Sequence, residues 1–343
     1  MKAAILTDLR EKLLVDDIEL PSNLEVGQVL VKLEYSGICG SQLGEIDGVK
    51  GEDKYLPHLL GHEGSGIVED IGPGVKTVKI GDSVVLHWKK GDGIQSDPPK
   101  YQWKGKIINA GWVTTFNSYA VVSENRCTTI PKDFPKEEAA LFGCAVTTGF
   151  GVVENNSKLR MGESVVVFGA GGIGLNIIQA AKLVSAWPII GVDVHQNRLE
   201  LAKELGATHI INSTVDDAFY QIKLILEKKG LDVFIDNTGI PEIIQKGYEI
   251  INQDGRVVLV GVPKQGQNIN IFSLPLHFGK SITGSFGGEC NPAKDIPRYI
   301  ELVRRGVLNL KGLISKYYEL EEINEAIESM RKGETAGRVM IKL

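Results

Sequence analysis

The string GAGGIG at residues 169–174 constrains the fold of this chain more than any other feature. It follows the apolar, strand-like residues 164–168 directly and opens a helical pattern over 172–184. In a G-x-G-x-x-G turn the first glycine makes the bend, the second admits a pyrophosphate and the third packs helix on strand. Glycine is abundant here, 40 of 343 residues, so the string alone is a weak signal, but its context predicts a dinucleotide-binding turn. The candidate cofactor-binding residues in it are Gly169, Gly171, Gly172, Ile173 and Gly174.

Asp193 extends this motif, because it lies nineteen positions after Gly174, at the end of the next apolar strand. Its carboxylate is expected to accept hydrogen bonds from the adenosine ribose. The same charge would repel a ribose 2′-phosphate, so the sequence favours NAD over NADP. Arg198 is a further candidate for a contact with the adenine or a phosphate, and a solvated helix position explains it equally well.

The texture of the chain changes around this motif. Residues 146–280 alternate five apolar strands with helical patterns, which predicts a parallel sheet covered on both faces. Residues 1–145 read as short β-branched strands between glycine turns, which predicts an all-β barrel or sandwich. Two helical segments and a last strand follow residue 290. We therefore expect an α/β protein with a dinucleotide-binding domain at 146–280 and a second, catalytic domain built from 1–145 and 281–343.

Charge and cysteine usage exclude several classes of protein. The net charge is −5 and no lysine or arginine block is present, so we expect no nucleic-acid partner. The apolar run before Asp8 is too short for a signal peptide, and the uncharged stretch 164–181 contains too many glycines and amides for a membrane span. The cysteines lie far apart, which predicts a cytoplasmic protein with reduced thiols: Cys39, Cys127, Cys144 and Cys290.

Three metal-ligating residue types form a second, sparser constellation: Cys39 in SGICGS, His62 in LLGHEGSG and Cys144 in LFGCAVTTGFG. Two thiolates and one imidazole leave the fourth position of a tetrahedral Zn²⁺ open, which is the layout of a catalytic site. Taken singly, each cysteine is equally a small buried hydrophobe and the histidine a turn residue. The spacing alone leaves both interpretations open.

In the order GICGS, GHEGSGIVEDIGPGVKTVKIGDSVV, GCAVTTGFG and VVVFGAGGIGL, these segments resemble the zinc-dependent medium-chain alcohol dehydrogenases. The resemblance runs from about residue 25 to the C-terminal GETAGRVMIKL. It implies a doubly wound Rossmann sheet joined to a mostly-β GroES-like catalytic domain. It also implies a zinc-dependent, NAD-linked oxidoreductase that interconverts an alcohol and its aldehyde or ketone by hydride transfer.

The resemblance assigns roles to individual residues. It makes Cys39, His62 and Cys144 the catalytic zinc ligands, Glu63 a carboxylate that can approach the metal, and Ser41 the hydroxyl that takes the proton of the bound alcohol.

It also places Thr148 and Arg338 against the nicotinamide end and the pyrophosphate of the cofactor, and Trp88 as an aromatic wall of the substrate pocket. Members of the family are dimers or tetramers, so we expect a homodimer or homotetramer. Residues 268–273, NINIFS, alternate polar and apolar side chains and are predicted to form an exposed edge that pairs with a second copy.

The sequence departs from the family pattern at four places. Residues 88–111 contain no cysteine, so we expect one catalytic zinc per subunit and no structural zinc. Gln42 replaces an aspartate that orients the zinc-bound histidine; its amide oxygen can still accept the imidazole N–H of His62. Gly44 replaces the histidine that ends the proton relay, so another residue or water must complete it. Finally, Cys144 stands where many polyol-oxidising members have a glutamate, which favours alcohol and aldehyde chemistry.

Two rival functions stay open. The stretch 88–112 holds three tryptophans and five lysines, which would suit a sugar, polyol or sugar-phosphate substrate oxidised at a secondary alcohol. We favour a solvated loop that packs its own aromatic side chains. Outside enzymes, the chain would be an inactive NAD-binding sensor or structural subunit. Gln42 and Gly44 keep that alternative open, whereas the intact ligand set and Ser41 argue against it.

Overall fold

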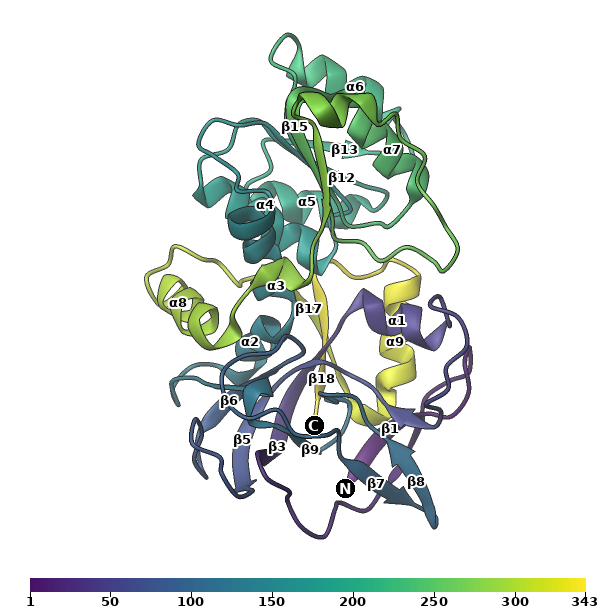
Figure 1. Ribbon diagram of the computed structural model, residues 1–343, viewed down its shortest axis with the longest axis vertical. Helices are drawn as coiled ribbons and strands as arrows, with labels where there is room; N and C mark the ends of the chain where they lie inside the picture. The colour runs from purple at the N-terminus through teal and green to yellow at the C-terminus, as the bar shows by residue number, and fades with distance from the viewer. The chain divides into compact units, whose positions relative to one another are not determined.

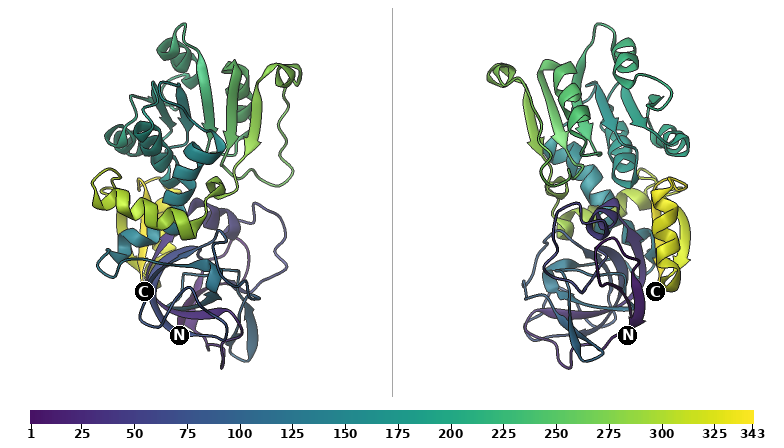
Figure 2. Two further views of the ribbon diagram at one scale, coloured as in Figure 1. Left: turned by 60° about the vertical axis from the view of Figure 1, so that its left-hand side comes forward. Right: turned by 90° about the vertical axis from the view of Figure 1, so that its right-hand side faces the viewer.

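The computed structural model describes residues 1–343 and divides into two compact units (Figure 1). The first contains residues 1–145, 291–305 and 314–343, and the second 146–290 and 306–313. Residues 281–290, expected in the catalytic domain, lie in the second unit, because β16 (Ser281–Gly284) pairs in parallel with β15 (Ile251–Leu259). Both chain termini lie in the first unit (Figure 2).

The first unit is built on two β-sheets, which confirms the predicted all-β organisation of its N-terminal part. One sheet has the order β2-β1-β4-β8-β7; the other has the order β10-β6-β5-β3-β18-β17, with β9 paired to β3. Its strands are β1 (Lys2–Leu6), β2 (Leu14–Asp17), β3 (Gln28–Ile38), β4 (His58–Leu59), β5 (Glu63–Ile71), β6 (Ser83–His87), β7 (Lys100–Trp103), β8 (Lys106–Asn109), β9 (Tyr119–Ser123), β10 (Cys127–Thr129), β17 (Ile314–Glu319) and β18 (Arg338–Lys342). Its helices are α1 (Gly40–Ile46), α2 (Lys136–Ala140), α8 (Pro292–Arg304) and α9 (Ile323–Arg331).

The register of the larger sheet brings distant segments together. β5 runs antiparallel to β6 and pairs Glu63 with His87, while β18 runs antiparallel to β3 and pairs Val339 with Ile38. The chain therefore leaves β3 beside the start of β18, so that Cys39 lies near Arg338. The C-terminal strand GRVMIKL is thus part of the same sheet as the residues that surround the metal-ligating side chains.

The second unit is a six-stranded parallel sheet in the order β13-β12-β11-β14-β15-β16. Its first four strands in the chain are β11 (Val165–Phe168), β12 (Ile189–Asp193), β13 (His209–Asn212) and β14 (Leu231–Asp236). The strand order reverses between β11 and β14, and ligands of open α/β sheets bind at such a point, beyond the carboxyl ends of the strands. The fold is α/β with a doubly wound sheet, as expected.

Helices cover both faces of this sheet (Figures 1 and 2). On one face α6 (Ala218–Leu226) and α7 (Pro241–Ile250) pack into a cluster with Val166, Ile190 and Phe234. On the other face α4 (Gly172–Leu183) and α5 (Gln196–Leu205) contact each other and their strands. A short helix, α3 (Ala145–Gly151), begins at the boundary with the first unit.

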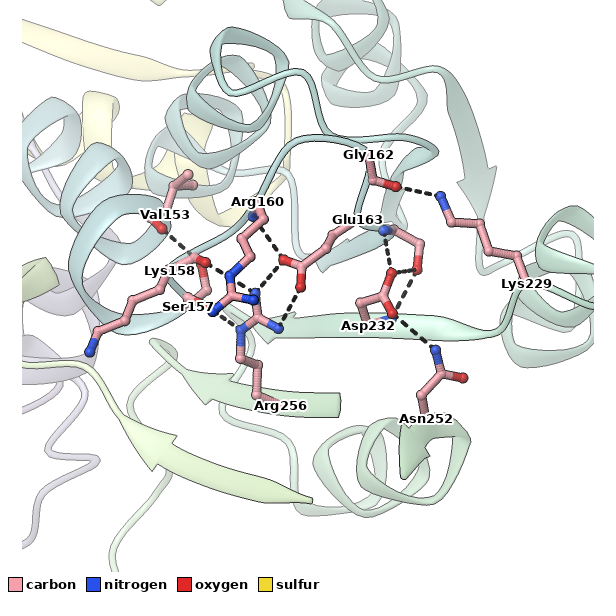
Figure 3. Close-up of polar contacts among 11 residues, drawn as sticks. Val153, Ser157, Lys158, Arg160, Gly162, Glu163, Lys229, Asp232, Asn252 and Arg256 are labelled. Carbon is pink, nitrogen blue, oxygen red and sulfur yellow. Dashed lines mark hydrogen bonds and ion pairs between the residues drawn. The ribbon is translucent and has the colours of Figure 1, made fainter. Parts of the chain in front are cut away.

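A polar network lies at the amino ends of β11 and β14, at the end of the sheet opposite the glycine turn (Figure 3). Asp232 accepts hydrogen bonds from the Ser164 backbone N–H at 2.8 Å and from Asn252 Nδ2 at 3.0 Å. Glu163 forms a two-point ion pair with Arg256, whose guanidinium also donates to the Ser157 and Lys158 carbonyls. These bonds satisfy backbone groups that precede the first strand, and they lie at the end of the sheet that does not carry the glycine turn.

Residues 268–273, which were predicted to form an exposed edge, are mostly exposed but form no strand within the single chain. The segment has no regular structure, since Ile271 packs against the core of the sheet and Tyr248 donates a hydrogen bond to the Phe272 carbonyl at 3.0 Å. The edge of the sheet is β16 instead. None of the helices combines the length and the apolar character needed to span a membrane.

Candidate metal and cofactor sites

The structure brings together the three side chains that the sequence singled out as metal ligands. Cys39 follows the end of β3, His62 directly precedes β5, and Cys144 lies in the turn between α2 and α3. The two thiol sulfurs are 4.0 Å apart, and the three ligand atoms all lie within 4.8 Å of one another. Both cysteines are buried, and His62 Nε2 is buried without a hydrogen-bond partner.

This donor set fits zinc. In a tetrahedral site with Zn–S bonds of about 2.3 Å, two sulfur ligands lie roughly 3.8 Å apart, close to the observed 4.0 Å. A buried imidazole nitrogen without a partner would be costly in the absence of a ligand. Two sulfurs and one nitrogen also leave one of the four positions for a substrate oxygen, which distinguishes a catalytic from a structural site.

A buried ion pair lies beside these ligands. Arg338 Nε is 2.7 Å from Glu63 Oε1, and both side chains are almost completely buried. The other carboxylate oxygen of Glu63 accepts from the Ala145 backbone N–H at 3.2 Å. The carboxylate passes so close to Gly37 on β3 that a side chain there would collide with it. Glu63 is therefore held behind the ligands by a cation, a backbone donor and a glycine.

The charges of this cluster shift its protonation equilibria. The hydrogen bond from Cys144 and the positive charge of Arg338 hold the pKa of the Cys39 thiol well below its usual value. Burial opposes the charged form of Arg338, but the neighbouring Cys39 and Glu63 raise its pKa. Burial raises the pKa of Glu63, and Arg338 works against that shift. A thiolate is the form of cysteine that binds metal, so this shift favours the metal-binding form of Cys39, whereas the hydrogen bond with Cys39 raises the pKa of the Cys144 thiol well above its usual value.

The residues near α1 differ from the sequence expectation. The sequence suggested that the amide oxygen of Gln42 accepts a hydrogen bond from the His62 ring. In the structure this oxygen accepts instead from the Gly61 backbone N–H. A side chain at Gly44 would come within 3.0 Å of Val49, so Val49 occupies the space beside this glycine. Ser41 is half-buried on α1, two positions after Cys39.

Trp88 directly follows His87, the last residue of β6, and His87 pairs with Glu63, the residue after His62. The Trp88 carbonyl accepts a hydrogen bond from Arg126, whose guanidinium also lies 5.7 Å from the centre of the Trp112 ring. Arg126 thus connects two tryptophans of the 88–112 stretch, a contact that nothing in the sequence indicated.

The rest of that stretch packs its aromatic side chains. Tyr101 is completely buried, and its hydroxyl oxygen accepts from the Val121 backbone N–H at 2.9 Å. Trp103 donates to Asp16 at 2.9 Å, and Lys104 forms an ion pair with the same carboxylate. These contacts join the β7–β8 hairpin to β9 through Tyr101 and to β2 through Trp103 and Lys104.

The glycine turn of the second unit has the geometry that the motif predicts. Gly169 has a φ of 97°, and a side chain at Gly174 would collide with the Gly169 carbonyl. At Gly171, which caps α4, a Cβ would meet no protein atom within 4 Å. The first and third glycines are therefore required by the fold itself, whereas the second leaves open space in front of the helix N-terminus.

Asp193 lies at the end of β12 beside this turn and is already engaged by the protein. One carboxylate oxygen accepts from the Ala170 backbone N–H at 2.7 Å and the other from the His195 backbone N–H at 2.9 Å. Arg198 approaches the carboxylate at 3.9 Å. Each oxygen keeps a second lone pair for a ribose hydroxyl. Asp193 thus connects the second strand to the backbone of the glycine turn.

Three buried polar atoms near the turn lack a hydrogen-bond partner: Thr148 Oγ1 on α3, Asn176 Oδ1 on α4 and Asn237 Oδ1 after β14. The two helices pack closely here, because a side chain at Gly149 would collide with Asn176. Asn176 was not singled out from the sequence, since an asparagine inside a helical pattern carries no distinctive signal.

A doubly wound sheet with a glycine turn, together with two cysteines and a histidine that could hold a metal ion, is the combination expected of a metal-dependent oxidoreductase that uses a dinucleotide. Family models agree with both units: residues 25–132 match the alcohol dehydrogenase GroES-like domain and residues 172–305 match the zinc-binding dehydrogenase domain.

Relatives extend this likeness to the full chain. An S-(hydroxymethyl)glutathione dehydrogenase of Synechocystis is 30% identical over 99% of both chains. Among solved structures, an alcohol dehydrogenase zinc-binding domain protein of Burkholderia ambifaria is 30% identical with a TM-score of 0.91, covering 100% of this chain and 98% of its own. Benzyl alcohol dehydrogenase of Acinetobacter calcoaceticus is 32% identical with a TM-score of 0.89, covering 100% and 99%. The chain belongs to the zinc-dependent medium-chain alcohol dehydrogenase family, and it is an oxidoreductase that interconverts alcohols and their carbonyl compounds.

Proposed function

We propose that this protein is an NAD-linked alcohol dehydrogenase with one catalytic zinc per subunit, bound by Cys39, His62 and Cys144. The observation that carries the proposal is the convergence of these three ligand atoms around a buried imidazole nitrogen that has no other partner. The first unit is then the catalytic domain and the second the dinucleotide-binding domain.

The chain's own residues would divide the work as follows. When bound, zinc supplies Lewis-acid polarisation of the alcohol oxygen. Ser41 takes the proton of the alcohol hydroxyl, and water continues the relay where Gly44 offers no side chain. Glu63, neutralised by Arg338, sets the electrostatic background of the ligands. Trp88 forms a wall of the substrate pocket.

The proposed cofactor site uses the open space at Gly171, the N-terminus of α4 and the free lone pairs of Asp193. Thr148, whose hydroxyl has no partner in the protein, is proposed to contact the nicotinamide end. Arg338, which forms an ion pair with Glu63, is proposed also to contact the pyrophosphate. Arg198, which lies near Asp193, is proposed to lie beside the ribose.

Alcohols and aldehydes are the preferred substrate class because Cys144, a thiolate ligand, stands where polyol enzymes use a carboxylate. The alternative is a sugar, polyol or sugar-phosphate dehydrogenase, and the packing of Tyr101 and Trp103 into the β7–β8 hairpin weakens it. A panel that includes S-(hydroxymethyl)glutathione and benzyl alcohol, the compounds for which two relatives are named, together with polyols, distinguishes these classes by NADH formation. No turnover with any of them would favour the inactive NAD-binding subunit.

Metal analysis of cysteine variants tests the ligand assignment. We expect about one zinc per native subunit, and Cys144→Ser should lose zinc and turnover together. Cys127→Ser and Cys290→Ser are matched controls, since both cysteines are buried but lie outside the cluster. Two zinc equivalents retained on dialysis, or a Cys144→Ser protein that keeps its metal, would contradict the proposal.

A homodimer or homotetramer is also proposed. Phe272, Leu274 and Phe278 are exposed beside the short edge strand β16, and such an apolar surface is typical of a contact between subunits. Sedimentation that finds only monomer at micromolar concentration would contradict it. Four cysteines without disulfide bonds support a cytoplasmic location.

A further inference from the structure

Gln42 makes two hydrogen bonds that together determine its orientation. Its side chain is 4% exposed; the amide oxygen accepts from the Gly61 N–H and Nε2 donates to Glu45 Oε2 at 3.0 Å. A carboxylate can only accept and a backbone N–H can only donate, so the reversed amide would face two mismatched partners. Glu45, one turn further along α1, therefore keeps the Gln42 oxygen directed at Gly61.

Gly61 is the residue that precedes His62, and its conformation is closely determined. Its φ is 91°, which favours glycine, and a side chain would collide with Thr115. The preceding carbonyl, that of Leu60, accepts from the backbone N–H groups of Thr115 at 3.0 Å and Phe116 at 3.1 Å.

On the other side of His62, the Glu63 carbonyl accepts from Ser36 Oγ at 3.1 Å. The backbone around His62 is thus held by the Thr115 segment, by Ser36 and, at the buried Gly61 N–H, by Gln42 alone among the side chains. Without Gln42 this donor would be left unsatisfied in the interior.

We propose that Gln42, oriented by Glu45, is a positioning residue for His62 that acts on the histidine's backbone through Gly61 and not on its ring. The proposal rests on the proposed function only in that His62 binds the metal. It gives Gln42 a role that differs from the ring contact expected from the sequence. The position of the His62 imidazole then depends on a hydrogen bond made by the preceding residue, from the Gly61 N–H to Gln42.

The rate of zinc release measures this role without reference to turnover. In Gln42→Leu the side chain keeps its approximate size but loses both hydrogen bonds. Loss of a group that orients a metal ligand typically costs 10–100-fold in metal affinity, so zinc transfer to a chromogenic chelator should become about 10–100-fold faster. The absorption bands of the cobalt-substituted protein should shift, because they report ligand geometry.

Gln28→Leu is the matched control. Gln28 is 3% exposed, lies in the same unit, and its amide oxygen likewise accepts a backbone N–H, that of Glu25 at 2.9 Å. This variant should release zinc at the native rate even where its thermal stability falls as much as that of Gln42→Leu. Equal acceleration in both variants would show a general loss of stability and overturn the proposal.

Glu45→Leu and Glu45→Gln provide a second, milder test. Glu45→Leu removes the orienting carboxylate and should speed zinc release by less than Gln42→Leu, whereas Glu45→Gln keeps an acceptor and should stay near the native rate. If Gln42→Leu does not fold, an unchanged rate in Glu45→Leu overturns the proposal. An unchanged rate in a folded Gln42→Leu overturns it as well. A native protein that binds no zinc would instead contradict the proposed function.

Discussion

At the scale of single residues, Asp193 has more than one task. The sequence indicated an acceptor for the ribose, and the structure adds bonds from the Ala170 and His195 backbone N–H groups. The carboxylate therefore shapes the glycine turn, and we expect it also to repel the ribose 2′-phosphate of NADP. A substitution here changes the cofactor site in two ways, through lost ribose contacts and through a looser turn.

We expect Asp193→Ala to weaken the binding of NAD by about 1–3 kcal/mol, because hydrogen bonds to the ribose are lost. The same change should remove the charge repulsion between Asp193 and the 2′-phosphate of NADP. Val194, the next residue, carries no charge, so the variant should accept both cofactors without preferring NADP. Comparison of kcat/KM for NAD and NADP in the native protein and the variant checks this. Native protein that already uses both equally well would show that Asp193 does not select the cofactor.

His87 gives a prediction for pH. It is completely buried; Nδ1 lies 2.7 Å from the Lys89 carbonyl and Nε2 2.9 Å from Thr128 Oγ1, which suits a neutral ring. Burial, with a smaller effect of the Arg126 charge, lowers the pKa of His87 to about 4, although the Lys89 carbonyl opposes the shift. In the unfolded chain the pKa is about 6.5, so the unfolded state binds the extra proton between these values.

The stability that depends on neutral His87 is therefore present above pH 6.5 and is lost as the pH falls towards 4. Between pH 7 and 4.5 the native protein should lose free energy of unfolding, of the order of 2 kcal/mol, in excess of the loss in His87→Gln. Urea unfolding of both proteins at the two pH values measures the difference. Equal losses would mean that His87 is charged in the folded state.

Among the secondary-structure elements, β11 and β14 are joined at their amino ends by a polar network (Figure 3). Because this network lies away from the glycine turn, we expect it to contribute to stability and not to cofactor binding. Asp232→Ala removes the acceptor of the buried Ser164 N–H, so we expect a loss of about 1–3 kcal/mol in the free energy of unfolding. Asp254→Ala, an exposed aspartate of β15, should change it by less than about 0.5 kcal/mol. Denaturant unfolding gives both values, and an Asp232→Ala protein as stable as native would contradict the role of the network.

The helices and strands with strong periodicity could be predicted from the sequence. The helix expected over 172–184 is α4 at Gly172–Leu183, and the five apolar strands of 146–280 are all present. The sixth strand, β16, was missed because SITG is short and partly exposed. The segment NINIFS, predicted as an exposed edge, is mostly exposed but forms no strand within the single chain. Alternation alone could not show that Ile271 packs into the core while Phe272 bonds to Tyr248.

In the candidate site, the metal-ligating residues could be predicted from the sequence, but the contacts of the residues around them could not. Cys39, His62 and Cys144 stand in recognisable motifs, whereas the Gln42–Gly61 bond, the Arg126 contact with Trp88 and the buried Asn176 arise from tertiary packing. Such contacts join residues with no shared sequence pattern. They became visible only when the strands were placed in register.

For the molecule as a whole, we propose that catalysis depends on two parts of the chain: the cluster of Cys39, His62 and Cys144 in one unit and the glycine turn in the other. In the first, the buried nitrogen of His62 has no hydrogen-bond partner. In the second, the space in front of α4, at Gly171, holds no protein atom. Neither part alone should sustain turnover. We therefore expect turnover by this chain to require both a metal and NAD.

The most direct measurement is NAD reduction by a primary alcohol, followed at 340 nm, with native, chelator-stripped and zinc-restored protein. We expect activity in the native protein, its loss on removal of about one zinc per subunit, and its return when zinc is added back. Cys144→Ser should stay inactive under all three conditions. Stripped protein that keeps the native rate would show that Cys39, His62 and Cys144 do not hold a catalytic metal.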